Sequence, residues 1–281
     1  MEVFRKVAEI KEFVRQKKAQ GKVIGLVPTM GYFHLGHLAL MREAKNSGDT
    51  VVVSIYVNPL QFGPQEDLAS YPRDEQRDLA LAGEIGVDAV FIPADAEMYP
   101  NGFSTYVEVE QLTSGLCGQF RPGHFKGVTT VVLKLFNIVT PDRAYFGQKD
   151  YQQLVVVRKM AEDLNLDVEI VGLPTVREPD GLALSSRNVY LNPEERKAAP
   201  LLQQSLLKAK EEIVNGERSP EKIRDLIARI LQSEPLIRTE YIEVREARHL
   251  EPLEYLEGRI VIALAARVGK ARLIDNILVE V

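Results

Sequence analysis

The sequence predicts an α/β fold: a Rossmann-like parallel sheet with helices on both faces, followed by a smaller α+β carboxyl-terminal domain. Up to about residue 173, short apolar and β-branched runs alternate with amphipathic helical segments. The runs are apolar on both faces, which is typical of parallel strands covered on both sides. Beyond Pro174, charged helices are followed by alternating strands. We therefore expect one domain over residues 1–175 and a second over residues 176–281.

The first domain is predicted to alternate helices and strands in chain order. Its first helix carries an apolar stripe of Val7, Ile10, Phe13 and Val14. The expected strands cover residues 22–27, 50–57, 89–92, 143–146 and 168–171, and the later helices cover residues 38–44, 73–84, 125–138 and 151–164. Because parallel sheets bind ligands at the carboxyl ends of their strands, we expect the site in the segments that follow those strands.

The second domain is expected to begin after a loop at residues 175–192, where Pro179, Gly181 and two serines stand. Asn192-Pro193-Glu194-Glu195 has a capping residue, a proline at the first helical position and acids in the first turn, which predicts a helix start. We expect charged helices over residues 194–214 and 220–232. Strands over residues 239–244, 259–266 and 272–279 then form a small sheet.

Composition excludes several classes of protein. The 281 residues are 45% hydrophobic and 27% charged, which is ordinary for a globular protein. A formal net charge of −5 argues against a dedicated nucleic-acid binder. The single cysteine, Cys117, excludes an internal disulfide, and no apolar run approaches the ~20 residues of a membrane span. The amino-terminal segment lacks the apolar core of a signal peptide, so we expect a cytoplasmic protein that contacts neither nucleic acid nor membrane.

The segment PTMGYFHLGH, residues 28–37, joins an expected strand to an expected helix. His34 and His37 are three residues apart, so both imidazoles lie on one helix face, at the end where free N–H groups and the helix dipole favour anions. Gly36 would let a ligand approach the backbone. This pattern indicates a phosphate-bearing ligand. The alternatives are two structural histidines or half of a metal site, which would want a third ligand of similar kind.

Two further segments carry candidate phosphate contacts. FGQKDYQQ, residues 146–153, stands at another strand-to-helix junction, where Lys149 can meet phosphate, Asp150 can cap the helix and Gln153 faces the same crevice. In the alternative interpretation Asp150 is only a cap and Lys149 a solvated lysine. LSSRN, residues 184–188, offers two hydroxyls and a guanidinium that suit a phosphate clamp, with a polar linker as the alternative.

Two more segments hold polar candidates. Asn58 and Gln61 follow the second expected strand, and neutral amides there recognise hydroxyls or a carboxylate without adding charge. They could equally be turn formers. Arg121 and His124 stand in the loop RPGHF, where a substrate contact and a purely structural role are not distinguishable from the sequence.

Together these segments resemble the motifs of the pantoate–β-alanine ligases. The motifs are PTMGYFHLGH, NPLQFG, YPR at residues 71–73, RPGHF, FGQKDYQQ and LSSRN, in order and at similar spacing. The likeness covers essentially the entire chain. That family belongs to the HxGH nucleotidyltransferases, whose motif and mobile serine and basic loop also serve class I aminoacyl-tRNA synthetases. Leu35 departs from many members, which carry an acid near this position, but on a helix it points away from the histidine face.

The resemblance implies an ATP-dependent condensation of pantoate with β-alanine. Pantothenate, a coenzyme A precursor, would form with AMP and pyrophosphate through a pantoyl adenylate. Mg²⁺ is expected on the phosphates of ATP, and a homodimer through the first domain is implied. Within the same superfamily, the alternative is a nucleotidyltransferase that acts on another small acid or a phosphate acceptor. A third alternative is a regulatory module that binds a nucleotide without chemistry. It would not explain why two histidines, Lys149 and the amides are expected to converge on one crevice.

The resemblance also assigns roles to residues. The implied catalytic residues are His34, His37, Lys149 and Arg187. The implied ATP-binding residues are Met30, Gly31, His34, Gly36, His37, Gly147, Gln148, Lys149, Asp150, Val176, Leu184, Ser185, Ser186 and Arg187. Gln61 and Gln153 are expected to bind pantoate or β-alanine, and no residue is expected to ligate a metal.

Overall fold

The computed structural model describes residues 1–64 and 66–281. Its first part is a six-stranded sheet in the order β1-β4-β3-β2-β5-β6, in which every neighbouring pair is parallel. The strands are β1 (Glu2–Phe4), β2 (Ile24–Thr29), β3 (Thr50–Ile55), β4 (Ala89–Phe91), β5 (Arg143–Gly147) and β6 (Glu169–Leu173). The predicted parallel sheet is confirmed.

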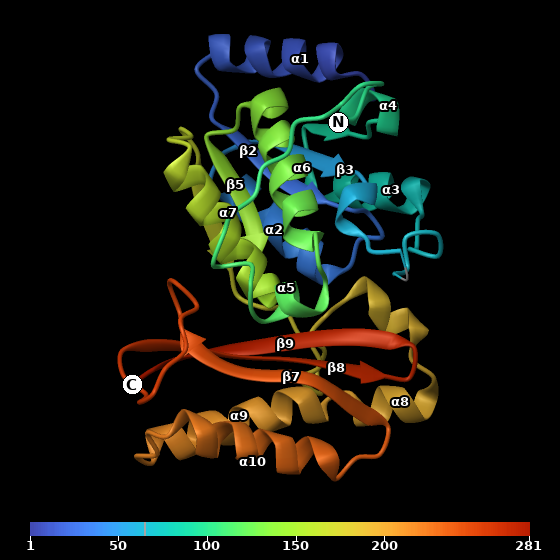
Figure 1. Cartoon of the computed structure of the whole chain (residues 1–281). Coiled ribbons are helices and arrows are strands. Elements are labelled where there is room, and N and C mark those ends of the chain that lie inside the picture. The colour runs from blue at the N-terminus through green and yellow to red at the C-terminus, as the bar shows by residue number, and fades with distance from the viewer. Residues whose placement is uncertain (65) are drawn as a thin grey trace.

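Helices cover both faces of this sheet, as Figure 1 shows. They are α1 (Val7–Ala19), α2 (Leu35–Asn46), α3 (Glu75–Ile85), α4 (Asp95–Met98), α5 (Cys117–Phe120), α6 (His124–Val139) and α7 (Tyr151–Asp163). Alternate residues of one strand enter different cores. Leu26 of β2 packs in the core with α1, α6 and α7, whereas Val27 packs in the core with α2 and α3. Burial on both faces is why the strand sequences show no polar alternation.

The strand order creates a switch point at β2. From β2 the chain builds outward through β3 and β4 on one side, and through β5 and β6 on the other. Crevices in open parallel sheets form outside the carboxyl ends of the strands at such a reversal. The segments after β2 and β5 are PTMGYFHLGH and FGQKDYQQ, so the topology brings together motifs more than 100 residues apart.

The second part is a three-stranded antiparallel sheet with helices on one face. Its strands are β7 (Ile237–Glu246), β8 (Arg259–Val268) and β9 (Ala271–Glu280), and its helices are α8 (Pro193–Ala198), α9 (Leu201–Val214) and α10 (Pro220–Gln232). α9 and α10 cover the face of the sheet that points away from the first domain, as Figure 1 shows. The predicted α+β character is confirmed, and the domain boundary at residues 175/176 stays a prediction.

Several expected elements differ in detail. The helix expected over residues 194–214 is two helices, because Pro200 has no backbone N–H and α9 begins only after it. β1 was not expected, and its three residues are too few to show a pattern. The loop expected over residues 175–192 contains the short 3₁₀ helix η3 (Ser186–Tyr190). Among the described residues, no helix is both long and apolar enough to cross a membrane.

Candidate functional site

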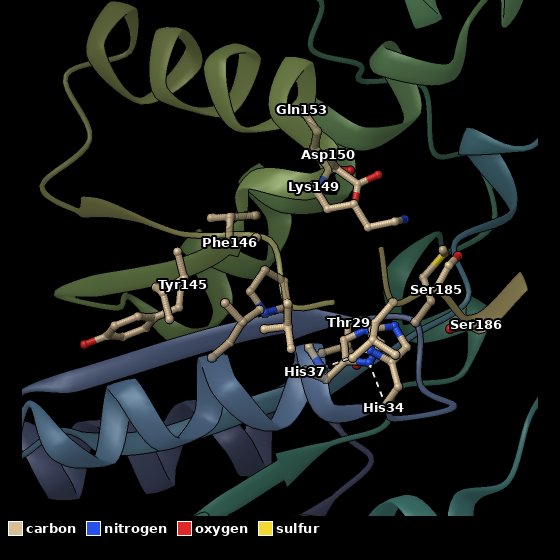
Figure 2. A pocket seen from close by; sticks show the side chains of 18 of the residues that line it. Thr29, His34, His37, Tyr145, Phe146, Lys149, Asp150, Gln153, Ser185 and Ser186 are labelled. Atoms are coloured by element: carbon tan, nitrogen blue, oxygen red, sulfur yellow. Dashed lines mark hydrogen bonds between the residues drawn. The ribbon is translucent and has the colours of Figure 1, made fainter. Parts of the chain in front are cut away.

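A cavity of about 220 Å³ opens at the carboxyl ends of β2 and β5. Figure 2 shows His34 and His37 on one side, Lys149, Asp150 and Gln153 on the facing side, and Ser185 and Ser186 at its edge. All but two of the residues to which the family resemblance assigns a role line it: Met30, His34, Gly36, His37, Gln61, Gly147, Lys149, Asp150, Gln153, Val176, Leu184, Ser185, Ser186 and Arg187. Gly31 and Gln148 are not among its lining residues.

The two histidines are held by the backbone of the helix start. His34 is the N-cap of α2, and its Nδ1 accepts a hydrogen bond from the Gly36 N–H at 3.1 Å. The backbone N–H of His34 donates to Nδ1 of His37 at 3.3 Å. The rings lie 4.1 Å apart, centroid to centroid. Because each Nδ1 accepts, each neutral ring carries its proton on Nε2.

Burial keeps both imidazoles neutral. It lowers the pKa of His34 to about 4, with the positive charge of Lys149 acting in the same direction. Burial, followed by the charges of His34 and Lys149, holds the pKa of His37 well below its usual value. At neutral pH the pair therefore offers hydrogen-bond donors and no net charge, and Lys149 carries the positive charge on the facing wall.

The glycines of the motif PTMGYFHLGH are required by the conformation and packing of the loop itself. A Cβ at Gly36 would lie 2.9 Å from the His34 ring, so the glycine makes room for the imidazole. Gly31 has a φ of +80° and faces Asp78, which explains why it does not line the cavity. The buried carboxylate of Asp78 accepts from the N–H groups of Tyr32 and Phe33 at 2.6 and 2.7 Å. Asp78 is thus a support for the motif that the sequence interpretation missed.

The segment after β5 is bound to the small sheet. Asn276 Nδ2, in β9, donates to the carbonyls of Gln148 and Lys149 at 2.9 and 2.8 Å. Both bonds are to backbone carbonyls; Lys149 lines the cavity and Gln148 does not. Asp150 stands at the N-cap of α7 but makes no side-chain capping bond, so the predicted capping role is wrong. Its carboxylate belongs to the cavity instead.

Gln61 is oriented by a buried network. Its Oε1 accepts from Asn58 Nδ2 at 3.1 Å, and its Nε2 donates to the sulfur of Met30 at 3.2 Å. The second N–H of Nε2 has no acceptor among residues 1–64 and 66–281, and Gln61 lines the cavity. Asn58 also donates to the Gly127 carbonyl and accepts from the Tyr99 hydroxyl. Asn58 therefore positions Gln61 from beneath and does not line the cavity, contrary to the expectation that both amides face it.

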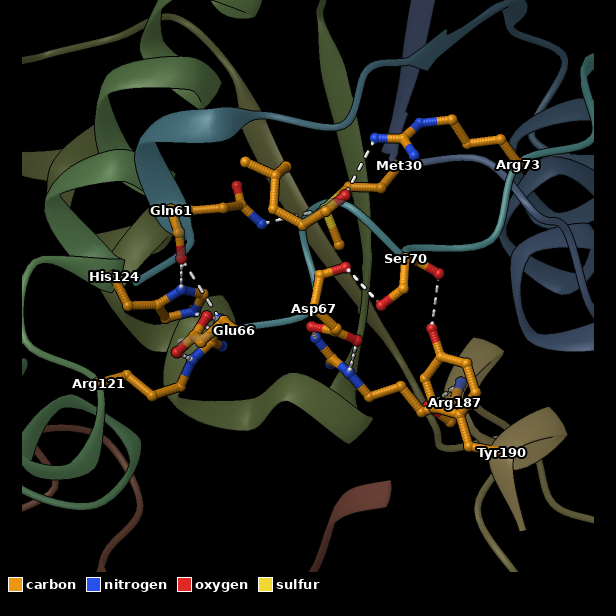
Figure 3. A network of polar contacts seen from close by, with 12 residues as sticks. Met30, Gln61, Glu66, Asp67, Ser70, Arg73, Arg121, His124, Arg187 and Tyr190 are labelled. Atoms are coloured by element: carbon orange, nitrogen blue, oxygen red, sulfur yellow. Dashed lines mark hydrogen bonds and ion pairs between the residues drawn. The ribbon is translucent and has the colours of Figure 1, made fainter. Parts of the chain in front are cut away.

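Arg187 reaches the cavity as part of a bridge to the first domain. Its Nε and Nη2 donate to the Asp67 carboxylate, each at 2.9 Å, and the Tyr190 hydroxyl donates to the Ser70 carbonyl at 3.1 Å, as Figure 3 shows. The charge and hydrogen bonds of Arg187 outweigh burial and lower the pKa of Asp67. Segment 184–190 is therefore more than a linker, and its partners in residues 66–71, Asp67 and Ser70, were not recognised in the sequence.

Arg121 and His124 act as supports. Arg121 donates to Glu66 and to the carbonyl of Gln61, and His124 Nδ1 lies 2.8 Å from that same carbonyl. Burial lowers the pKa of His124 to about 4, so it is neutral at physiological pH. Both residues therefore hold the backbone of Gln61 in place, as Figure 3 shows.

An apolar wall faces the polar groups, and the sequence interpretation did not assign it. Val128, Val131, Val132 and Leu135 of α6 all line the cavity and are at most 7% exposed. Their spacing of i, i+3, i+4 and i+7 marks one face of a helix. The signal was present in the sequence, but an apolar helical stripe usually marks a core and does not by itself indicate a site.

The comparisons with known proteins bear on the whole chain. A family profile described as pantoate-beta-alanine ligase matches residues 2–278. The chain belongs to the pantoate–β-alanine ligase family. The pantothenate synthetase of Carboxydothermus hydrogenoformans is 57% identical over 282 residues, which is 100% of both chains. The crystal structure of pantothenate synthetase from Thermus thermophilus is 49% identical and superposes with a TM-score of 0.94 over 99% of both chains.

A third relative was solved with ligands. The pantoate–β-alanine ligase of Francisella tularensis, complexed with β,γ-ATP and β-alanine, is 34% identical with a TM-score of 0.79, over 99% of this chain and 97% of that one. Membership of the family gives this chain its activity: it is an ATP-dependent ligase that joins pantoate to β-alanine and produces pantothenate. The cavity at the switch point of the sheet is where such a reaction would be housed.

Proposed function

We propose that this ligase works in two steps within the cavity between α2 and η2 (Gln148–Asp150). A carboxylate oxygen of pantoate attacks the α-phosphorus of ATP, the bond to the bridging oxygen breaks, and pyrophosphate leaves. The amine of β-alanine then attacks the activated carbonyl, loses a proton, and displaces AMP. The observation that carries this proposal is the convergence of two neutral imidazoles, one lysine and two glutamines on one cavity.

ATP would lie along the motif after β2 and the segment after β5. One side is formed by Met30, His34, Gly36 and His37. Gly31 contributes by allowing the turn between them. Gly147, Lys149 and Asp150 form the other side, and Gln148 acts through the turn that they share, which its carbonyl ties to Asn276. Val176 and Leu184–Arg187 would cover the nucleotide. The Nε2–H donors of His34 and His37, with Lys149 and Arg187, are placed for the charge that builds on the phosphates. The relative complexed with β,γ-ATP supports a nucleotide in this fold.

Pantoate would lie between Gln61, Gln153 and the apolar wall of α6. The free N–H of Gln61 can donate to a carboxylate or hydroxyl, and the valines suit the two methyl groups of pantoate. Neutral amides bind the acid without forming an ion pair that would make its oxygen less nucleophilic. β-Alanine, bound in the Francisella tularensis relative, would reach the same carbonyl after pyrophosphate has left.

Mg²⁺ would accompany the phosphates of ATP. Among the described residues, no group of three or more histidine, cysteine, aspartate or glutamate side chains could hold a metal ion. Asp150 is the single carboxylate among the described residues that line the cavity. This fits a magnesium ion bound mainly by phosphates and water with at most one protein carboxylate. Mg²⁺ would offset phosphate charge, while the residues of the chain orient the reactants.

Pantoate-dependent exchange of labelled pyrophosphate into ATP, with β-alanine omitted, tests the adenylate step. We expect exchange that requires pantoate and is lost in Lys149→Ala. Exchange that requires β-alanine would contradict the two-step order. If other small acids supported exchange and pantoate did not, the chain would instead be a nucleotidyltransferase of the same superfamily that acts on another small acid.

We also propose that the chain forms a homodimer through its first domain, as the resemblance to the family implies. Val3, in the edge strand β1, and Tyr106 are exposed large apolar side chains on that part of the chain. Sedimentation equilibrium across a range of concentrations would report one species of twice the 31.6 kDa chain mass. A single species at the monomer mass would contradict the dimer.

A further inference from the structure

A second cavity, of about 530 Å³, lies beside the crevice, between residues 66–67 and one end of the small sheet. Its charged lining residues are the cations Arg121, Arg187, Arg238, Arg267, Lys270 and Arg272 and the acids Glu66, Asp67 and Glu240. Six positive and three negative groups give a formal charge of +3, in a chain whose net charge is −5. We call this cavity the basic cavity, because its lining is positively charged although the chain as a whole is negatively charged.

Three of its arginines form a row across the small sheet. Arg238 of β7 is directly opposite Arg267 of β8, and Arg267 is directly opposite Arg272 of β9. Directly paired residues point to the same face, and like charges in such pairs destabilise a sheet. Glu240 offsets the repulsion only in part, with 3.0 Å to Arg267 Nε and 2.7 Å to Arg272 Nε. A row of this kind is stabilised when an anion binds to it.

Donors in the basic cavity also remain unpaired. Nη2 of Arg272 is buried and has no hydrogen-bond partner within residues 1–64 and 66–281. In the same described part of the chain, Arg121, Arg187, Arg267 and Arg272 form ion pairs with the three acids of the cavity. Arg238 and Lys270 have no carboxylate oxygen within 4.0 Å there. An anion of several charges in the cavity would supply acceptors for the exposed Arg238 and Lys270.

The basic cavity and the crevice have walls in common with a third, smaller cavity. This third cavity, of about 70 Å³, is lined by Lys149 and Gln153 of the crevice and by Arg121 and Arg272 of the basic cavity. Arg187 contributes to the walls of all three spaces. The three cavities thus form a series with shared walls, and this path from the proposed phosphate contacts to the outer end of the small sheet is lined by cations together with Asp150 and Asp275.

We propose that pyrophosphate leaves the crevice along this path and binds in the basic cavity on its way out. The inference rests on the adenylate chemistry proposed above. Pyrophosphate carries several negative charges and is attracted by the cavity, whereas β-alanine is a zwitterion with no net charge. A side path also lets the leaving group depart while the crevice stays covered, which protects the adenylate from water.

The test uses the full-length chain and inorganic pyrophosphate as the probe. Pantoate-dependent exchange is measured as a function of pyrophosphate concentration in Arg238→Gln/Lys270→Gln and in Lys270→Glu. Both side chains are exposed and lie outside the crevice, so folding and the chemical step should persist. The matched control is Lys210→Gln/Arg229→Gln, which removes two exposed charges from α9 and α10 on the far face of the small sheet.

We expect the KM for pyrophosphate to rise roughly tenfold in the double variant, as when charge-assisted contacts are lost. The KM values for ATP and pantoate should stay within about twofold, and the control should match the unsubstituted chain. Equal KM values for pyrophosphate in all proteins would overturn the inference. A raised KM for β-alanine in the complete reaction, with an unchanged KM for pyrophosphate in exchange, would also overturn it. Absence of exchange in the unsubstituted chain would instead refute the adenylate chemistry.

Discussion

At the scale of single residues, the backbone around the start of α2 sets both the charge and the tautomer of the paired histidines. Each Nδ1 accepts a backbone N–H, and burial keeps each ring neutral. In the proposed mechanism the imidazoles therefore act as donors from Nε2. The positive charge that meets the phosphates comes from Lys149 and Arg187, which face them across the cavity.

The pKa of His34 predicts how stability depends on pH. Between about pH 4 and 6.5 the unfolded chain protonates this histidine and the native chain does not, so stability falls as the pH drops. His34→Asn keeps a good N-cap and removes the titrating ring. From pH 7 to pH 5 we expect the unsubstituted chain to lose about 2 kcal/mol more unfolding free energy than the variant. Urea unfolding at both pH values measures this difference, and parallel losses would contradict the assignment.

Removal of a donor from the cavity should slow the reaction without unfolding the chain. His37→Ala and Lys149→Ala should each lower turnover by roughly 10²–10³-fold, the cost of losing one transition-state donor. Steady-state rates with all substrates saturating measure the loss, and urea unfolding checks the fold. Lys210→Ala, on exposed α9, is the control. Near-normal turnover of His37→Ala would refute the role assigned to the histidine motif.

At the scale of elements, the longer helices and strands could be predicted from the sequence. The doubly covered strands β2 and β3 and the apolar helix α6 were recognisable by uninterrupted or periodic apolar residues. β1 was missed because three residues carry no period. The break at Pro200 was missed because helical pattern continues on both sides of it.

The site was predictable to a similar degree, and for a related reason. Residues that follow a strand, such as His34 and Lys149, could be predicted to share one cavity because topology places strand ends together. Asp67, Asp78 and Asn276 were missed because each acts through a contact with a segment distant in the chain. Ordinary acids and amides in loops or on helices give no local signal of such contacts.

The bridge between residues 66–71 and 184–190 predicts an effect on ATP. Asp67 engages Nε and Nη2 of Arg187 and leaves Nη1 for a phosphate oxygen. Asp67→Asn should therefore loosen the guanidinium and raise the KM for ATP roughly tenfold, with the KM for pantoate unchanged. Asp180→Asn, which removes the partner of Arg196 in another ion pair, is the matched control. An unchanged or lower KM for ATP in Asp67→Asn would show that Asp67 does not orient Arg187.

At the scale of the whole molecule, hydrogen bonds from the second domain reach two of the segments that form or border the crevice. Asn276 of β9 binds the backbone of the segment after β5, and Arg187 and Tyr190 bind residues 66–71. Both contacts reach loops that contribute to or border the cavity. The domain is therefore suited to respond to a bound nucleotide as a unit, and a lid needs such coupling if it is to exclude water from an adenylate.

This coupling predicts a joint change in hydrogen exchange when substrates bind. With ATP and pantoate present, amides of residues 66–71, 184–190 and 274–278 should all gain protection, because closure of the domain tightens both attachments at once. Exposed amides at the ends of α9 and α10, on the far side of the small sheet, should exchange as before and serve as an internal control. Protection confined to residues 184–190 would mean that this loop closes alone while the domain stays still. No change in any of the three segments would show that the second domain is not a lid, and that the adenylate is protected by the walls of the first domain.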